Sequence, residues 1–225
     1  VVLLKQVGCH PVIIHGGGPQ ITKHLEKQGI ESKFANGMRI TDEKSIDIIE
    51  MVLGGLINKD IVNTITSLGG KAVGLSGKDG GLIRAKKIEG EGEFKNIDFK
   101  NTGTVKSIDP GVVKLLDGSS FIPVIAPIGI GDDGKTYNIN ADIVAGKIAH
   151  ILQASKYLIL TNTQGILDSN GSLIQSINTD GVKRLAKEGI LSQGMLPKVN
   201  SALEAVTSGV EHVQIIDGTI DHSDI

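Results

Sequence analysis

Short apolar runs of strand length alternate with segments of helical spacing along most of the chain. The strand candidates are Val12–Ile14, Ala72–Leu75, Phe121–Ala126, Tyr157–Leu160 and Val213–Ile216. The helix candidates are Asp42–Leu53, Leu56–Leu68, Pro110–Leu116, Ala141–Leu152, Thr179–Lys187 and Lys198–Ser208. Near-continuous apolar strands that alternate with helices are typical of a parallel sheet covered on both faces. The pattern therefore predicts an α/β fold in which a mainly parallel sheet is sandwiched between helices (αβα).

The segment Leu82–Val105 interrupts this alternation, because it is polar and rich in glycine. It contains two short extended pieces, Leu82–Ala85 and Thr102–Lys106. We therefore expect an inserted β-hairpin around residues 82–106. Thr136–Ile139 is a further candidate for a short strand.

Gly129, Gly131 and Gly134 match the G-x-G-x-x-G pattern of dinucleotide-binding loops. In that motif a helix follows the glycines and carries the pyrophosphate at its amino end. Here Asp132 and Asp133 would face the phosphates, and a strand candidate follows in place of a helix. Because Asp-Gly is a hairpin signal, we interpret this segment as a hairpin turn.

A run of three glycines, Gly16–Gly18, lies between the strand candidate Val12–Ile14 and a helical pattern that begins at Pro19. Glycine allows the backbone to approach a ligand closely, and proline suits the first position of a helix. The amino end of a helix attracts an anion through its unpaired N–H groups and its dipole. The segment therefore predicts an anion site, and a tight strand-to-helix turn without a ligand is the alternative.

The segment Tyr137–Asp142 places polar side chains at a second strand-to-helix junction. Alternate residues of an extended segment face the same side, so Asn138 and Asn140 are expected to converge. Asn140 can cap the helix that begins at Ala141, and Asp142 suits the first turn of that helix. We predict a site for a polar ligand here, because sheet ligands bind beyond the carboxyl ends of strands. Helix capping alone is the alternative.

Two cations stand near predicted helix starts. Arg39 precedes a helix that Thr41 is expected to cap, and its planar fork suits a carboxylate. Lys198 follows Pro197, the expected first residue of a helix, where a cation opposes the dipole. A residue placed against local preference suggests a use such as neutralising phosphate charge. Solvated surface positions are the alternative for both side chains.

The polar turn Thr161–Leu167 follows the buried strand candidate Tyr157–Leu160. A polar turn at the carboxyl end of a strand is a candidate nucleotide site.

The composition excludes several classes of protein. A formal charge of −2 and an aromatic content of 3% give no support for nucleic-acid binding. No apolar stretch has the ~20 residues needed to cross a bilayer, and the first residues lack the layout of a signal peptide. Cys9 stands alone, so we expect no intrachain disulfide, a cytoplasmic protein and a small buried cysteine. The histidines are scattered without metal-ligand spacing, so we expect no metal site within the protein.

Several of these segments, taken in order, resemble the amino acid kinase family, and within it the branch that phosphorylates N-acetyl-L-glutamate. The matching segments are His15–Pro19, Gly37–Asp42, Gly77–Gly80, Tyr137–Asp142, Thr161–Leu167 and Gly194–Val199. The glycine run is shared across related kinases, whereas the combination of Gly37–Asp42 with Asn138–Asp142 is more specific. The resemblance implies the amino acid kinase fold and phosphoryl transfer from ATP to the side-chain carboxylate of N-acetyl-L-glutamate. The product would be N-acetyl-L-glutamyl 5-phosphate, in arginine biosynthesis.

The resemblance also implies roles for individual residues, in catalysis, acyl-amino-acid binding and nucleotide binding. Gly17 and Gly18 would offer backbone N–H groups to the transferred phosphoryl group. Arg39 and Asn138, with Asn140 beside them, would bind the acyl amino acid. Lys198 would neutralise phosphate charge, and Asp142 would orient lysines. The nucleotide pocket would be lined by Thr161, Asn162 and Gly165.

The chain also departs from the family pattern. The family opens with a strand that carries a lysine and a pair of glycines, whereas this sequence begins at what resembles the end of the following helix. We expect both termini to be truncated, and this chain to show little or no activity. The nucleotide turn usually reads Thr/Ser-Asp, whereas this chain has Thr161-Asn162, so one nucleotide contact is in doubt.

The expected organisation is one kinase domain in two lobes, with residues 1–153 for the acyl amino acid and residues 154–225 for the nucleotide. The small-molecule partners would be N-acetyl-L-glutamate and ATP with Mg²⁺, and the metal would be held mainly by the phosphates of the nucleotide. The protein would form a homodimer or a higher homo-oligomer. The alternatives are a kinase for aspartate, glutamate, carbamate or an aminoadipate-type substrate. A non-catalytic module that binds an amino acid or a nucleotide is the alternative from another class.

Overall fold

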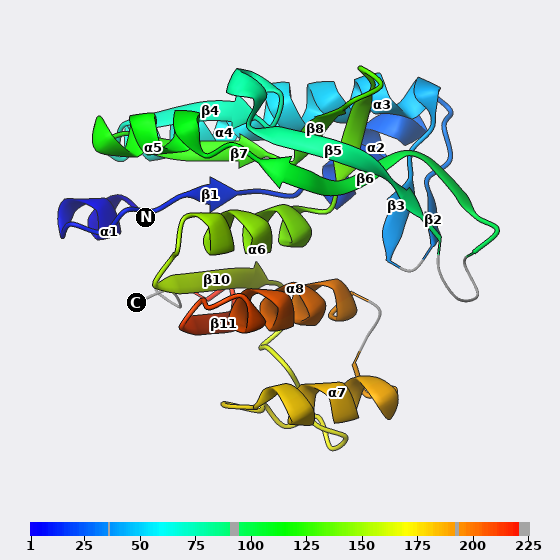
Figure 1. The fold of residues 1–225 in the computed structure, drawn as a ribbon, viewed down its shortest axis with the longest axis vertical. Coiled ribbons are helices and arrows are strands. Elements are labelled where there is room, and N and C mark those ends of the chain that lie inside the picture. The colour runs from blue at the N-terminus through cyan, green and yellow to red at the C-terminus, as the bar shows by residue number, and fades with distance from the viewer. Residues whose placement is uncertain (36, 91–94, 192–193, 221–225) are drawn as a thin grey trace. The chain divides into compact units, whose positions relative to one another are not determined.

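The computed structural model describes residues 1–35, 37–90, 95–191 and 194–220. Residues 91–94 of the expected hairpin lie outside the described residues. The chain forms two compact units, Val1–Val144 and Ala145–Ile225, and Figure 1 follows them by colour along the chain. The boundary between the units falls inside α6 (Ala141–Ile151). The division of function between residues 1–153 and 154–225 stays a prediction.

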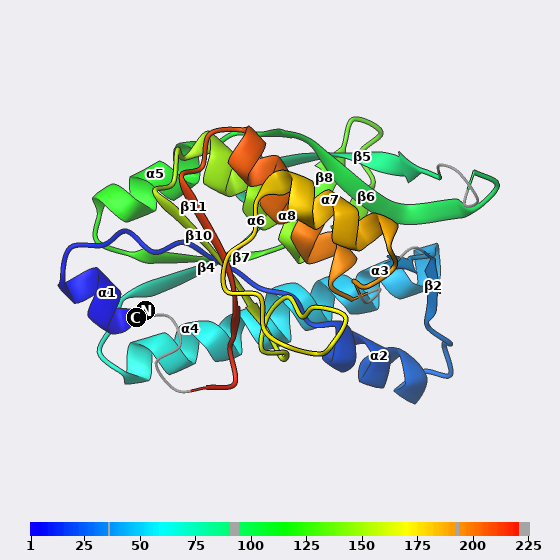
Figure 2. The same ribbon diagram turned by 90° about the horizontal axis from the view of Figure 1, so that it is seen from below.

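The first unit is organised around a parallel sheet in the order β1 (Ile13–Ile14), β7 (Ile122–Ala126) and β4 (Ala72–Ser76). Helices α4 (Asn58–Ser67) and α5 (Gly111–Gly118) cover its opposite faces, as Figure 2 shows. Ile65, Ile122 and Val124 are buried together between α4 and the sheet. The predicted arrangement of parallel strands between helices is confirmed.

One long helical segment replaces the two helices expected over Asp42–Leu53 and Leu56–Leu68. It consists of α3 (Glu43–Glu50), a π-helical segment η1 (Met51–Ile57) and α4. The break predicted at Gly54-Gly55 is therefore wrong. A π-turn holds more residues than an α-turn, so it shifts the phase of the apolar stripe. Val52 and Leu53 thereby reach the same core as Ile49 without an interruption of the helix.

A closed barrel of four strands accounts for the insertion. β5 (Ile83–Glu89) and β6 (Asp98–Ile108) pair antiparallel, which confirms the inserted hairpin. β8 (Ile128–Gly131) and β9 (Thr136–Ile139) form a second antiparallel pair, with Gly134 at a φ of 74° in the turn between them. The interpretation of the G-x-G-x-x-G segment as a hairpin turn is confirmed. Parallel pairing of β5 with β8 and of β6 with β9 closes the barrel.

A small antiparallel hairpin that the pattern did not predict connects α2 (Gly18–Lys27) to α3. Its strands are β2 (Lys33–Ala35) and β3 (Met38–Ile40). The short helix α1 (Val2–Gln6) begins the unit, and a 3-10 turn η2 (Asp79–Gly81) precedes β5. Cys9 follows α1 and is exposed, so the expectation of a buried cysteine is wrong. It lies in the connection from α1 to β1, outside the hydrophobic clusters.

The second unit contains a parallel pair, β10 (Lys156–Thr161) and β11 (His212–Asp217), in register over all six residues. α8 (Leu196–Thr207) packs on this pair through a cluster that includes Tyr157, Ile159 and Ala205. α7 (Thr179–Lys187) packs on α8 through a second cluster that includes Leu185 and Val199.

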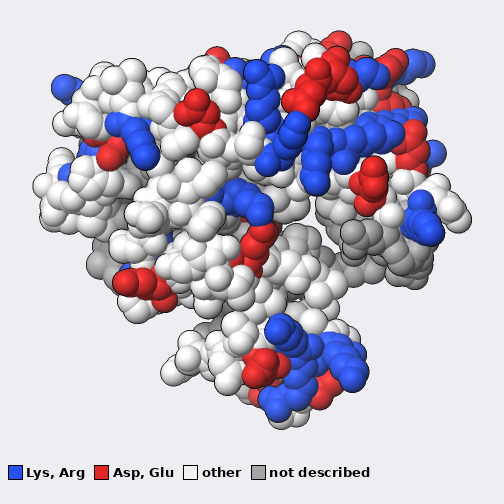
Figure 3. Space-filling view, in the orientation of Figure 1, with Lys and Arg blue, Asp and Glu red and all other residues white. Residues whose placement is uncertain are grey.

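In Figure 3, charged side chains of both signs gather over the β5–β6 side of the first unit and around α7, and much of the remaining face is uncharged. Lys87 pairs with Asp98 and Lys106 with Asp132 along the β5–β6 hairpin and the neighbouring turn. Among the described residues, no helix has both the length and the hydrophobicity needed to cross a bilayer.

Candidate functional site

The glycine turn passes from β1 directly into α2, as the sequence predicts. Gly17 is the residue before the helix, so Pro19 is the second helical residue and not the first as expected. The Gly17 carbonyl accepts from Ile21 N at 2.9 Å, the first hydrogen bond of the helix. Because a peptide unit is planar and trans, this bond directs the Gly18 N–H away from the helix body. The turn therefore offers donors at a helix amino end, where an anion is favoured.

The three glycines meet different surroundings. A Cβ on Gly17 would lie 2.3 Å from Ile57 Cδ1 and 2.9 Å from Leu53 Cδ2, both on η1. A Cβ on Gly16 would make ordinary contact at 3.8 Å with Ala141, and one on Gly18 would meet nothing within 4 Å. A side chain at position 17 would force Ile57 and Leu53 to shift, whereas packing gives no reason for glycine at position 18.

Arg39 lies on β3, and its guanidinium reaches back to the glycine turn. It is 7% exposed and lies 4.6 Å from the centroid of the Phe34 ring. Nη2 donates to Gly18 O at 3.2 Å and to Thr22 Oγ1 at 2.9 Å, and Nη1 donates to Ser32 Oγ.

All three acceptors of Arg39 are neutral, and no Asp or Glu pairs with its guanidinium within the part of the chain that the structure describes. Burial lowers the pKa of Arg39 below its ordinary value, but an arginine in a protein stays charged. The alternative of a solvated surface arginine is wrong. A buried positive charge without a carboxylate partner favours an anionic ligand beside the glycine turn.

Asn138 and Asn140 occupy the junction between β9 and α6. Asn140 Oδ1 accepts from Asp142 N at 2.8 Å and from Ile143 N at 3.3 Å, so the predicted cap is confirmed. Asn138 Nδ2 donates to Thr41 Oγ1 at 3.1 Å, which ties β9 to the residue after β3. Both asparagines therefore have structural partners, and Asp142 lies in the first turn of α6 as expected.

The sequence predicts Thr41 as the cap of α3, and this prediction is wrong. Asp42 takes that position, and its carboxylate accepts from Ser45 N at 2.9 Å. The Ser45 hydroxyl also donates to this carboxylate, at 2.6 Å. Together the two hydrogen bonds from Ser45, with the hydroxyl as the larger cause, keep the pKa of Asp42 below its usual range. Thr41 instead forms a β-bridge to Lys100 and is fully buried, because its backbone joins the end of β3 to β6 of the barrel, where its carbonyl accepts from Asn101 N at 2.7 Å. Sequence reasoning missed this role, since the bridge joins segments far apart in the chain.

Lys78, in the segment Gly77–Gly80, also joins distant elements of the first unit. Its Nζ lies 2.8 Å from Glu50 Oε1, at the end of α3, and 3.1 Å from Thr136 Oγ1, at the start of β9. Asp79 accepts from Ser76 N at 2.6 Å and fixes the turn after β4. These contacts hold the carboxyl end of β4 against the elements that carry Asn138.

In the second unit, Thr161 ends β10 and its carbonyl accepts from Gly218 N at 2.8 Å. Asn162 is exposed in the turn that follows. Gly165 has a φ of 134°, and a Cβ there would lie 2.9 Å from Leu173 Cδ1, so glycine is required by local geometry. Lys198 is half-buried in the first turn of α8, where Leu196 and not Pro197 is the first helical residue. The residues predicted for the nucleotide thus lie beyond the carboxyl end of a parallel strand and at a helix start.

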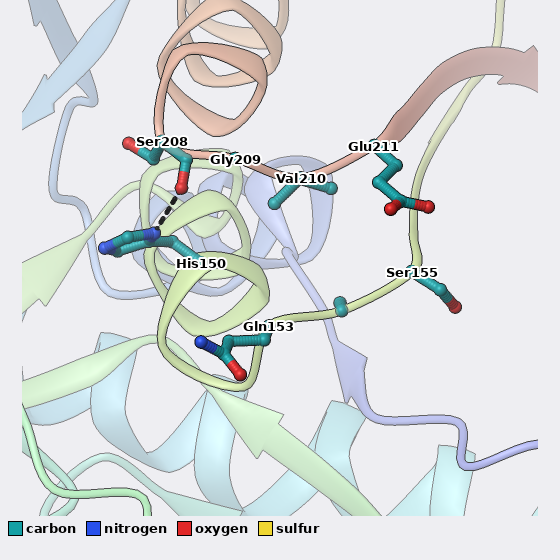
Figure 4. Close-up of a pocket in the computed structure, with 8 residues that line it drawn as sticks. His150, Gln153, Ser155, Ser208, Gly209, Val210 and Glu211 are labelled. Carbon is teal, nitrogen blue, oxygen red and sulfur yellow. Dashed lines mark hydrogen bonds between the residues drawn. The ribbon is translucent and has the colours of Figure 1, made fainter.

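A cavity of about 370 Å³ in the second unit lies elsewhere. Figure 4 shows His150 at the end of α6, Ser155 before β10 and Glu211 before β11 around it, with His150 Nδ1 2.9 Å from Ser208 O. Ser155 and Glu211 precede the strands, so this cavity lies at their amino ends. Ligands of parallel sheets bind at the carboxyl ends, so this cavity is separate from the predicted nucleotide turn. Over the described ranges, no three His, Cys, Asp or Glu side chains are arranged to hold a metal ion.

Comparison with known proteins identifies the family. Residues 1–217 match the sequence profile described as the amino acid kinase family. The chain belongs to the amino acid kinase family. Relatives of this kinase-family chain include acetylglutamate kinases from Alkalilimnicola ehrlichii and Methylobacillus flagellatus, which are 52% and 53% identical to it. Each alignment covers 99% of this chain and 75% and 77%, respectively, of those proteins.

Solved structures agree with this membership of the amino acid kinase family. The protein smu.665 from Streptococcus mutans has a TM-score of 0.87 and 28% identity, over 95% of this chain and 84% of its own. N-acetylglutamate synthase from Neisseria gonorrhoeae, complexed with coenzyme A and N-acetyl-glutamate, has a TM-score of 0.79 and 26% identity. The match covers 98% of this chain and 50% of the synthase. Carbamate kinase from Giardia lamblia bound to AMP-PNP, with a TM-score of 0.66 and 16% identity over 96% and 79%, shares the fold.

Proposed function

We propose that this chain transfers the γ-phosphoryl group of ATP to the side-chain carboxylate of N-acetyl-L-glutamate, forming N-acetyl-L-glutamyl 5-phosphate and ADP, although its departure from the family pattern predicts little or no activity. The proposal is carried by the acetylglutamate kinases that are 52–53% identical to the chain over 99% of its length. The reaction would belong to arginine biosynthesis in the cytoplasm.

The buried Arg39 supports an acidic substrate in the first unit. Its guanidinium contacts only neutral acceptors among the described residues and lies beside the glycine turn. We assign it the α-carboxylate of the acyl amino acid. Asn138 and Asn140, at the junction of β9 and α6, are assigned to the same substrate. The other carboxylate attacks the γ-phosphorus, and the bond from that phosphorus to the β-phosphate oxygen breaks. No general base is needed, because a carboxylate is already a nucleophile.

Transfer of this kind depends on positioning and on stabilising charge at the moving group. We assign the N–H groups of Gly17 and Gly18 to the equatorial oxygens of the transferred phosphoryl group. Lys198 neutralises the phosphates, Asp142 orients the cations, and Thr161, Asn162 and Gly165 hold the nucleotide. Mg²⁺ would be held mainly by the phosphates of ATP, and the protein would work as a homodimer or higher oligomer.

The proposed reaction is tested by single-turnover transfer from γ-labelled ATP, with the acyl phosphate trapped by hydroxylamine. N-acetyl-L-glutamate is expected to exceed L-glutamate, L-aspartate, carbamate and L-aminoadipate by at least about tenfold in transfer rate at low concentration. A preference for one of the other acceptors would assign the chain to another activity of the family. Binding of ATP without transfer to any acceptor would make it a nucleotide-binding module.

We expect Gly17→Ala to lower the stability of the fold and Gly18→Ala to lower the transfer rate. Gly17→Ala pushes a methyl group into Ile57 and Leu53, so it should destabilise the fold by about 1–3 kcal/mol. Gly18→Ala meets no protein atom, so its unfolding free energy should stay within about 0.5 kcal/mol of the wild type. Its transfer rate should nevertheless fall by about tenfold or more, because the methyl group stands where the phosphoryl group approaches.

Chemical denaturation and single-turnover transfer, measured on both variants, check this pair. Gly16→Ala is the matched control for the turn, since its added methyl group makes only ordinary contact. A fully active Gly18→Ala variant would contradict the assignment of the Gly18 N–H to the phosphoryl group.

A further inference from the structure

His15 lies directly before the glycine turn and is buried, with 7% of its surface exposed. Two contacts hold its ring: Nδ1 lies 3.0 Å from Gly16 O, and Nε2 lies 3.1 Å from Asn58 Nδ2. A carbonyl oxygen only accepts, so Nδ1 carries the proton. Nε2 is then the acceptor, provided that Asn58 presents its NH₂ group to it.

The partners of Asn58 fix the orientation of its amide. This side chain is fully buried where η1 meets α4, and Nδ2 donates to Val124 O at 3.0 Å and to Leu75 O at 3.3 Å. Its Oδ1 accepts from Lys59 Nζ at 3.1 Å. Carbonyls accept and an ammonium donates, so exchanging the two ends of the amide would break all of these bonds. Asn58 therefore turns its NH₂ group to His15, and the two protons of this group are shared among Nε2, Val124 O and Leu75 O. A neutral imidazole is the form that accepts in this position.

The surroundings of His15 favour this neutral form. Burial lowers the pKa of His15 below its ordinary value of 6.5, although the hydrogen bond to Gly16 acts in the opposite direction. The packed segments β4, β7 and η1 contain no ionisable residue. On the other elements, Lys59 of α4 contacts Asn58, and Asp142 lies in the first turn of α6, whose Ala141 faces Gly16. Protonation would place a second donor, Nε2–H, against the Asn58 NH₂ group.

We propose that neutral His15, held by Asn58, is a positioning residue that aims the Gly17 N–H at the transferred phosphoryl group. Gly16 C=O and Gly17 N–H belong to one planar trans peptide, so holding the oxygen sets the direction of the N–H. Asn58 connects this peptide to the carbonyls of β4 and β7 and to the end of η1, which packs under Gly17. Protonation of His15 breaks the hydrogen bond between Nε2 and Asn58, so the Gly16–Gly17 peptide loses its connection to β4, β7 and η1. Transfer therefore fails in acid. The inference rests on the proposed transfer reaction.

The test combines the pH profile of single-turnover transfer with NMR of the His15 ring. In the wild type, the transfer rate is expected to fall with acid only below pH 6.5, through the lowered pKa. His15→Leu, which loses both ring contacts, should transfer about tenfold to a hundredfold more slowly, since small misplacements of reacting groups have effects of that size. His15→Asn keeps a donor for Gly16 O, so it should recover part of the rate without the acid limb.

His10→Asn is the matched control, because His10 is a titratable side chain of the same unit and is exposed. It should keep the rate and pH profile of the wild type. An acid limb that persists unchanged in His15→Asn, or a His15→Leu rate equal to the wild-type rate, would overturn the inference.

The ring itself gives a readout that does not depend on activity or on folding of a variant. Imidazole ¹⁵N shifts of the wild type should show the Nδ1–H tautomer and a pKa below 6.5. The Nε2–H tautomer, or a pKa above 6.5, would refute the network. If the wild type transfers to no acceptor, the proposed function fails, whereas these shifts and the response of the Gly17 amide to MgATP still decide the role of His15.

Discussion

Replacing Arg39 by Met should raise the concentration of N-acetyl-L-glutamate needed for half-maximal transfer by about one to two orders of magnitude. Hydrogen bonds to a charged group contribute about 1.5–3 kcal/mol each, and the α-carboxylate would lose its cation. The binding of ATP should change less, because the residues assigned to the nucleotide, Thr161, Asn162 and Gly165, lie in the second unit, whereas Arg39 lies on β3 of the first. Single-turnover rates at varied acceptor concentration measure the first quantity, and equilibrium titration with ATP measures the second.

Arg39→Lys separates charge from geometry. It keeps the positive charge but loses the planar fork that reaches Gly18, Thr22 and Ser32 together, so an intermediate loss of acceptor affinity is expected. Both substitutions also remove internal hydrogen bonds, so the unfolding free energy should be measured beside the transfer rate. Arg84→Met, at an exposed position on β5, is the control. Unchanged acceptor affinity in a folded Arg39→Met variant would contradict the assignment.

The sequence predicts those parts of the fold that depend on local chemistry. The capping side chain of Asn140 and the Asp-Gly turn before β9 act within a few residues, and the structure has both. The alternation of apolar strands and helices likewise predicts the parallel sheet, because burial on both faces needs near-continuous apolar runs.

Features that depend on distant contacts do not follow from the pattern. The π-helical segment η1 continues a helix through Gly54-Gly55, since its apolar residues reach a core completed by α2 and β7. Closure of the barrel requires β5 to meet β8, which is a contact between separate hairpins.

The candidate site shows the same division. Arg39 has the residue type and position that suggest an anion, but its burial and its neutral partners arise from α2 and the loop before β2. Asn58 gives no signal at all, because α4 also contains polar residues such as Lys59 and Asn63, and nothing local marks the carbonyls that Asn58 alone meets. The sequence therefore identifies the groups that would meet ligands more readily than the groups that hold them in place.

Replacing Lys198 by Met should lower the transfer rate by about a hundredfold to a thousandfold, the usual effect of removing one group that stabilises transition-state charge. ATP binding should weaken by less, because the charge on the moving phosphoryl group is greatest during transfer. Lys198→Arg keeps the charge at a different reach, so its rate should lie between those of Met and Lys. Single-turnover transfer at saturating ATP and acceptor is the measurement.

The stability of Lys198→Met distinguishes this catalytic role from a structural one. Lys198 lies in the first turn of α8, where a cation opposes the helix dipole by about 0.3–1 kcal/mol. Loss of that repulsion offsets the loss of the contacts that Lys198 makes, so the variant should unfold at nearly the same denaturant concentration as the wild type. Lys183→Met, on the exposed side of α7 in the same unit, is the control for removing a charge. A large loss of stability with an unchanged transfer rate would place Lys198 in the packing of α8 and remove it from the chemistry.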